Sequence, residues 1–112
     1  MSRPGRYVTR RELGWSAVSP ADSADPKSGL VIHYDSVDQG LASKSHSECI
    51  AYWKRTRNFH TGPSRGWVDI GYSFLACAHG YVMEGRGIFR AQAAQPGGNT
   101  SHYSVTLATG PT

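Results

Sequence analysis

The sequence has only 2 cysteines among its 112 residues, and Cys49 and Cys77 do not form a C-x-x-C pair. A disulfide between them remains open, but we favour two buried thiols, because one distant pair does not indicate a disulfide framework. No apolar run approaches about eighteen residues, and the N-terminal segment contains no apolar signal-peptide core. We therefore expect no membrane insertion and no Sec export. The protein would be made in the cytoplasm without a signal peptide, and something else would deliver it to a target outside.

Several familiar catalytic and binding patterns are also missing. There is no G-x-S-x-G elbow for a serine nucleophile, no phosphate-binding glycine loop and no HExxH motif. The 5 histidines include no H-x₃-H pair, and no zinc-finger spacing occurs. No spacing of the acidic residues selects a catalytic carboxylate pair. Nucleic-acid binding would rest on charge alone, so we expect no nucleic-acid partner.

Acidic residues are outnumbered, and the net charge is +4. Such a balance favours anionic partners in general: nucleic acid, acidic lipid or a polyanionic bacterial wall. The positive charge gathers at the N-terminus and again in the run "KRTR" at 54–57. For the run at 54–57, a solvent-exposed helix face is the simpler interpretation.

Length and composition predict a single α+β domain over residues 1–112, with a flexible basic lead at 1–7. Apolar residues make up 38% of the chain, beside 13 glycines and 6 prolines, which suits a loop-rich domain. "VTRRELGW" (Val8–Trp15) predicts one turn of helix capped by Thr9. Ser45 and Glu48 have the spacing of a capping box, and apolar residues then recur at helical spacing. We expect a helix over Ser47–His60, ended by Gly62 and Pro63.

Four segments are expected to be strands: Leu30–Tyr34, about Ile70–Ala76, Tyr81–Glu84 and His102–Gly110. Gly80 supplies a positive-φ position for the turn between the second and the third. The expected architecture is a mixed sheet with the helix on one face. The other face would lack a helix of its own, and an exposed sheet of that size invites association.

The stretch "GWVDIGYSFLACAHGYVMEGRG", Gly66–Gly87, concentrates aromatic and charged residues. Asp69 could hydrogen-bond to local N–H groups, and Gly71 permits close approach beside Tyr72. A core role for the aromatic residues of this stretch stays open. Glu84 and Arg86 could pair with each other, or the arginine could bind a carboxylate through two parallel hydrogen bonds.

Taken together, five segments carry a resemblance: "VTRRELGW", "LVIHYDS", "NFH…GWVDIGYSFL", "HGYVMEGRG" and "NTSHYSVTLATG". In this order and at these intervals they resemble the family of peptidoglycan recognition proteins and type 2 N-acetylmuramoyl-L-alanine amidases, which includes phage lysozyme-type amidases. The resemblance covers nearly the whole chain and is most specific in "GWVDIGYSF…GYVMEGRG". It implies a mixed β-sheet with packed helices.

The resemblance also implies roles for particular residues. His33 matches the family's first zinc ligand, and Tyr72 matches the catalytic tyrosine that positions water and the scissile carbonyl. The implied substrate-binding residues are Trp67, His60, Glu84, Arg86 and Tyr34. The implied reaction is zinc-assisted hydrolysis of the amide between N-acetylmuramic acid and L-alanine.

The chain departs from this family pattern at several positions. Tyr34 and Asp35 stand where the family has a second histidine and a threonine, and Ala94 replaces a groove histidine. The family's remaining zinc ligands follow a further C-terminal helix, whereas this chain ends at Thr112. A catalytic zinc needs about three protein ligands, so zinc as a cofactor is expected to have an incomplete site.

Three hypotheses for function follow. The first is a peptidoglycan- or muropeptide-binding domain, of phage or bacterial wall-lytic origin, that has lost part of its zinc site. The second is an active zinc amidase, an endolysin acting at the bacterial cell wall after delivery by a phage. The third is a structural phage component that reuses the fold. For each of them, a second copy or a partner chain could cover the exposed sheet face.

Overall fold

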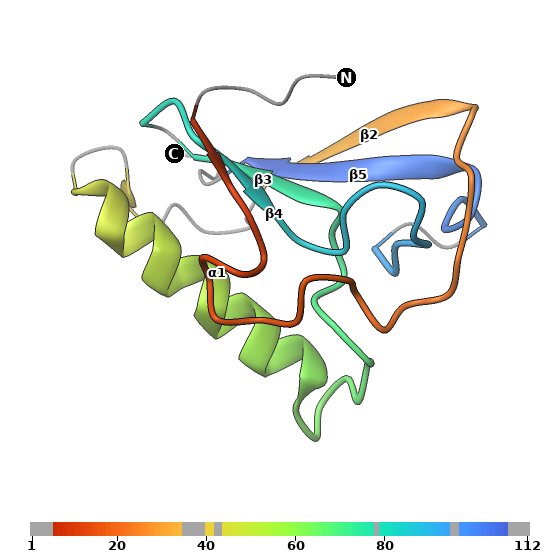
Figure 1. The fold of residues 1–112 in the computed structure, drawn as a ribbon, viewed down its shortest axis with the longest axis horizontal. Helices are drawn as coiled ribbons and strands as arrows, with labels where there is room; N and C mark the ends of the chain where they lie inside the picture. Colours follow the sequence, from red (N-terminus) through yellow and green to blue (C-terminus); the bar gives the residue numbers. More distant parts are fainter. Residues whose placement is uncertain (1–5, 35–39, 42–43, 78, 95–96, 108–112) are drawn as a thin grey trace.

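The computed structural model describes residues 6–34, 40–41, 44–77, 79–94 and 97–107. Within these ranges the chain forms one mixed sheet with a helix on one side (Figure 1). The strand order is β1-β4-β3-β5-β2; β3 and β4 are antiparallel, and the other neighbouring pairs are parallel. The strands are β1 (Tyr7–Val8), β2 (Gly29–Tyr34), β3 (Phe74–Ala76), β4 (Val82–Glu84) and β5 (His102–Leu107). The predicted α+β class with a mixed sheet is confirmed.

Helix α1 (His46–Thr61) extends one residue beyond each predicted end. Cys49, Trp53 and His60 are its buried residues, and their spacing of four and seven places them along one stripe. Gly62 follows the helix as its C-cap and donates its N–H to Phe59 O at 3.3 Å. Within the described residues, no helix combines the length and the apolar character needed to cross a membrane.

The capping box predicted at the start of α1 is wrong. Ser45 is the N-cap residue, but its side chain makes no capping hydrogen bond. Its Oγ lies instead 2.7 Å from Oγ of Ser47, within hydrogen-bonding distance. The reciprocal capping arrangement occurs earlier in the chain, where Glu12 N–H donates to Thr9 Oγ1 at 3.3 Å and Thr9 N–H donates to Glu12 Oε1 at 3.4 Å. The predicted Thr9-capped turn is therefore confirmed.

The sequence placed the start of the third strand too early. The strand begins at Phe74 rather than about Ile70, because the preceding N–H groups bond to side chains. Gly71 N–H donates to His60 Nδ1 at 2.9 Å, and Ser73 N–H donates to Ser104 Oγ at 3.2 Å. The segment before β3 thus leaves the ladder and becomes available to line a site.

The two faces of the sheet differ in what covers them. On the helix side Trp53 is fully buried, and its indole N–H donates to Glu84 O at 3.0 Å. The buried core also includes Val8, Leu13, Leu41, Cys49, Ile70, Leu75, Cys77 and Met83. On the opposite face no described helix covers the sheet, and edge strand β2 leaves Leu30 and Ile32 exposed at 55% and 61%. The expectation of an uncovered face therefore holds for the described residues, whereas oligomerisation stays a prediction.

Candidate functional site

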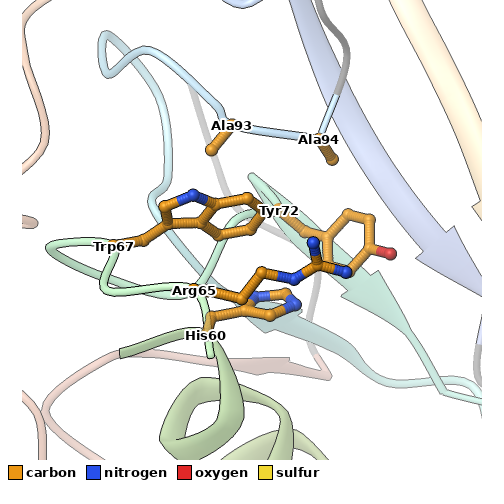
Figure 2. A pocket seen from close by; sticks show the side chains of 6 residues that line it. All are labelled: His60, Arg65, Trp67, Tyr72, Ala93 and Ala94. Atoms are coloured by element: carbon orange, nitrogen blue, oxygen red, sulfur yellow. The ribbon is translucent and has the colours of Figure 1, made fainter. Parts of the chain in front are cut away.

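A hollow of about 290 Å³ lies beside the C-terminal end of α1. Figure 2 shows His60 at the helix end, Arg65 and Trp67 on the loop that follows, and a second loop on the opposite side. The pocket is lined by His60, Arg65, Trp67, Tyr72, Ala93 and Ala94. Three of the predicted site residues, His60, Trp67 and Tyr72, are thus brought together.

His60 is held in one orientation and kept neutral. Its Nδ1 accepts the Gly71 N–H at 2.9 Å, so in the neutral ring the proton is on Nε2. Burial above all, together with the nearby charges of Arg65 and Arg86, lowers the pKa of His60 to about 4. At neutral pH the pocket therefore contains an uncharged imidazole beside cationic groups.

Trp67 packs tightly because Gly71 has no side chain. A Cβ on Gly71 would lie 2.6 Å from Cζ3 of the Trp67 ring, which is a steric clash. The Trp67 ring centroid lies 4.8 Å from that of His60, and the guanidinium of Arg65 lies 5.4 Å from the Trp67 ring centroid. This wall of the pocket therefore places the Arg65 guanidinium over the ring of Trp67, with the His60 ring beside it.

Tyr72 links the pocket to the predicted metal-ligand position. Its ring centroid lies 5.7 Å from that of His60 and 5.5 Å from that of His33, and it stacks on Trp53 at 6.3 Å. His33 Nε2 is buried and has no hydrogen-bond partner among the described residues. An unsatisfied imidazole nitrogen is a group for which a ligand would be favourable.

The described residues do not fit a catalytic zinc at His33. Such sites use about three protein ligands. The described side chains that gather closely enough to hold an ion are His46, Cys49, Cys77 and His79, and His33 is not one of them. No zinc-assisted hydrolysis therefore follows from the described residues around His33. Tyr34 is one of the predicted substrate-binding residues, and its side chain lies outside the described part of the structure.

Asp69 anchors the loop that carries Trp67. Its Oδ2 accepts Arg10 Nη1 at 2.6 Å, and its Oδ1 accepts Arg57 Nε at 3.0 Å and Ile70 N–H at 2.9 Å. Burial by itself would raise the pKa of Asp69. The hydrogen bond from Ser19, the charge of Arg10 and the bonds from Arg57 and Ile70 outweigh burial, so the pKa of Asp69 is lowered. The predicted bond from Asp69 to a local N–H is confirmed.

Glu84 and Arg86, two predicted substrate-binding residues, make contacts within the chain. Arg86 is buried, with Nε 2.7 Å from Ile70 O and Nη1 3.0 Å from Ala91 O. Glu84 Oε1 accepts the Arg10 N–H at 2.9 Å. Among the ion pairs of the described residues, none joins Glu84 to Arg86. Their observed contacts hold the hairpin beside the pocket.

Two lining residues, Arg65 and Ala93, were missed from the sequence. The available signal for Arg65 was a cation two positions before Trp67, shortly after the glycine and proline that end the helix. Nothing about Ala93 distinguishes it in sequence, since an alanine lines a pocket only through its backbone position.

No protein-family model matches the chain, but several known proteins are similar to it. Over 81 residues it is 39% identical to peptidoglycan-recognition protein SC2 of Drosophila simulans, a match covering 71% of this chain and 42% of that protein. Over 89 residues it is 34% identical to N-acetylmuramoyl-L-alanine amidase of Sus scrofa, covering 80% of this chain and 14% of that protein. The chain thus spans less than half of the length of these curated relatives.

Solved structures of peptidoglycan-recognition proteins are similar to this chain in fold. Wild-type Drosophila PGRP-LB aligns with a TM-score of 0.78 and 26% identity, covering 91% of this chain and 59% of that one. A mutant of the same protein, solved in complex with tracheal cytotoxin, aligns with a TM-score of 0.78 and 26% identity over 92% of this chain and 60% of the other.

Proposed function

Since this chain is a relative of the peptidoglycan-recognition proteins and N-acetylmuramoyl-L-alanine amidases, we propose that it is a peptidoglycan-binding domain. The binding site is the pocket at the end of α1, and the ligand is a muropeptide of a bacterial cell wall. Wild-type PGRP-LB shares this fold, and a mutant of that protein has been solved with tracheal cytotoxin bound, which supports a ligand of this class.

The observation that carries the proposal is the juxtaposition of aromatic rings and a guanidinium in one hollow. His60, Trp67 and Tyr72 offer apolar ring surface. Arg65, with its side chain exposed, offers paired N–H donors that match a carboxylate. A muropeptide combines a sugar and lactyl portion with a peptide that has free carboxylates, so both kinds of group find a partner.

We assign the remaining predicted residues according to their contacts. Glu84 and Arg86 are positioning residues that hold the hairpin beside the pocket, because their polar atoms already bond to the chain itself. His33 faces Tyr72 and contributes an unsatisfied nitrogen to the far end of the site. Tyr34 follows His33 directly in the sequence and remains a predicted substrate-binding residue.

A second candidate function is the zinc amidase itself. Its specific support is the contact between His33 and Tyr72, which resembles the first zinc ligand and catalytic tyrosine of the family. Zinc would supply a polarised carbonyl and an activated water, but the described residues offer a single ligand at His33. We therefore rank binding above hydrolysis. The cell wall is the proposed site of action in both cases, with phage delivery as one route.

One experiment separates these functions. The purified chain is mixed with peptidoglycan, with and without added zinc, and both co-sedimentation and new L-alanine N-termini are followed. We expect sedimentation without release. The variant Arg65→Ala should weaken sedimentation, whereas Arg55→Ala removes the same charge from an exposed helix position outside the pocket and should not.

The other outcomes are equally informative. Release of L-alanine N-termini that disappears in His33→Ala would establish the amidase. If a folded chain neither sediments with peptidoglycan nor releases L-alanine N-termini, both functions are contradicted. That result would favour a structural component. Equal sedimentation of Arg65→Ala and the wild type would contradict the assigned pocket.

A further inference from the structure

A second group of metal-binding side chains lies at the other end of α1 from the pocket. His46 and Cys49 come from the first turn of the helix, and Cys77 and His79 come from the turn between β3 and β4. Figure 1 shows the start of α1 and this turn at the same end of the molecule. His46 and His60 are separated by about 21 Å along the helix at 1.5 Å per residue, so this group is distinct from the pocket.

The distances within the group match the edges of a tetrahedral site. Cys77 Sγ lies 3.1 Å from His79 Nδ1 and 3.5 Å from His46 Nδ1, and Cys49 Sγ lies 3.4 Å from His79 Nδ1. In a tetrahedral zinc site, bonds of about 2.0–2.3 Å place neighbouring nitrogen and sulfur ligands about 3.5 Å apart. The four ligand atoms all lie within 4.8 Å of one another.

Hydrogen bonding alone explains this arrangement poorly. His79 Nδ1 lies within reach of both thiol sulfurs, yet a neutral imidazole nitrogen has one lone pair to share. His79 Nε2 is also buried and has no hydrogen-bond partner among the described residues. A cation placed between the two sulfurs and the Nδ1 atoms of His46 and His79 would bind all four of these atoms together, whereas His79 Nε2 would keep its proton.

The surroundings hold the ligands in place. Cys49 is fully buried and Cys77 is 7% exposed. The ring of His46 stacks on Tyr81 with the centroids 3.6 Å apart, and Cys77 N–H donates to Tyr81 O at 2.8 Å. Stacking and backbone bonding of this kind fix the orientation of a ligand before the metal arrives.

We propose that His46, Cys49, Cys77 and His79 form a structural Zn²⁺ site. Two sulfurs and two nitrogens are a ligand set that zinc prefers, and four protein ligands leave no open position for a substrate. One ligand pair comes from a helix and the other from a strand-to-strand turn. When Zn²⁺ binds, it displaces the protons of the two thiols, and these protons are released to the solvent. The site joins the start of α1 to the β3–β4 turn.

The test uses the full chain, purified and fully reduced with a metal-free reductant. Zinc content is measured by mass spectrometry, and Co²⁺ is titrated as a spectroscopic substitute. We expect one equivalent of metal and the intense visible absorption of tetrahedral cobalt with thiolate ligands. Zinc removal by a chelator should lower the melting temperature, and zinc addition should restore it.

Two variants locate the metal. Cys49→Ser and Cys77→Ser should each lose the thiolate-to-cobalt absorption, and the melting temperature should become insensitive to chelator. The matched control is His33→Ala, which removes a histidine outside the group and should keep the cobalt spectrum unchanged.

Three results would overturn the proposal. The first is a folded, fully reduced wild-type chain that binds no cobalt, a measurement that does not depend on whether the variants fold. The second is a cobalt spectrum that survives both cysteine variants and is lost in His33→Ala. The third is a disulfide between Cys49 and Cys77 that mass spectrometry still detects under the reducing conditions that free an exposed pair.

Discussion

The rings of His33 and Tyr72 meet edge to face, with centroids 5.5 Å apart and planes inclined by 60°. His33 belongs to β2 and Tyr72 lies two residues before β3, although β5 lies between these two strands in the sheet. The contact therefore forms over the face of the sheet and depends on both side chains reaching across β5. It joins the predicted metal-ligand position to the pocket at the helix end.

Substitutions at Tyr72 should distinguish binding from catalysis. Tyr72→Phe keeps the ring that contacts His33, His60 and Trp53 and removes only the hydroxyl. For a binding site we expect little change in muropeptide affinity with Tyr72→Phe and a loss of about tenfold, or 1.4 kcal/mol, with Tyr72→Ala. Isothermal titration calorimetry measures both. A phenylalanine variant as weak as the alanine variant would show that the hydroxyl, rather than the ring, binds the ligand.

His60 should make the stability of the protein depend on pH below neutrality. Its pKa is about 4 in the folded chain and 6.5 when unperturbed, so the unfolded chain binds the proton more readily. Stability from this residue is fully present above pH 6.5 and is lost progressively as the pH falls toward about 4. This difference between the two pKa values corresponds to about 3 kcal/mol in the free energy of unfolding. Solvent screening at the pocket mouth reduces the expected contribution to about 1–2 kcal/mol.

The measurement for His60 is urea denaturation at a series of pH values. His60→Asn keeps an acceptor for the Gly71 N–H and cannot titrate, so its stability should vary less across this window. Identical pH profiles for the variant and the wild type would assign the dependence to other groups.

Asp69→Asn should strongly destabilise the fold. The aspartate pairs with Arg10, which is 1% exposed, and with Arg57, so its neutralisation leaves a buried guanidinium without a counter-charge. We expect a loss of about 3–5 kcal/mol in the free energy of unfolding. The control is Asp25→Asn in the exposed pair with Lys27, for which we expect a change within about 0.5 kcal/mol. Similar losses in the two variants would contradict the role of Asp69 as an anchor.

Gly71→Ala should displace the Trp67 ring from the pocket wall. The added methyl would lie 2.6 Å from Cζ3 of Trp67, and overpacking of this kind costs about 1–3 kcal/mol. Tryptophan fluorescence should change with the variant, and muropeptide binding should weaken. In a Trp67→Ala background the clashing ring is absent, so Gly71→Ala should lower the free energy of unfolding by less. A cost that is equal in the two backgrounds would place the strain elsewhere.

Much of the fold could be predicted because its signals are local. The apolar residues at helical spacing, followed by Gly62 and Pro63, predicted α1 to within one residue at each end. The short run at 30–34 likewise defined β2 to within one residue. The family resemblance then gathered His60, Trp67 and Tyr72 into one site, and the structure places all three around the pocket.

Other features could not be predicted because they depend on which distant groups meet. The start of β3 moved to Phe74 since His60 and Ser104 supply acceptors that no local pattern reveals. Strand β1 has only the length of Tyr7–Val8, too short for a periodic signal, and it overlaps the lead expected at 1–7. The proposed zinc ligands show no H-x₃-H or C-x-x-C spacing in the sequence, because they form mixed His–Cys pairs that only the fold brings together.

The position of β2 at the edge of the sheet has a consequence for synthesis. Its neighbour is β5, and Tyr34 pairs with Leu107, so the pairing of β2 can be completed only after residue 107 has been made. At about 5–20 residues per second, the 73 positions that separate these partners correspond to roughly 4–15 s of translation. During that interval Leu30 and Ile32 lie on a strand without its partner, which is the state in which nascent chains associate wrongly. A ribosome-bound chaperone that shields apolar strands would therefore find its substrate here in residues 29–34.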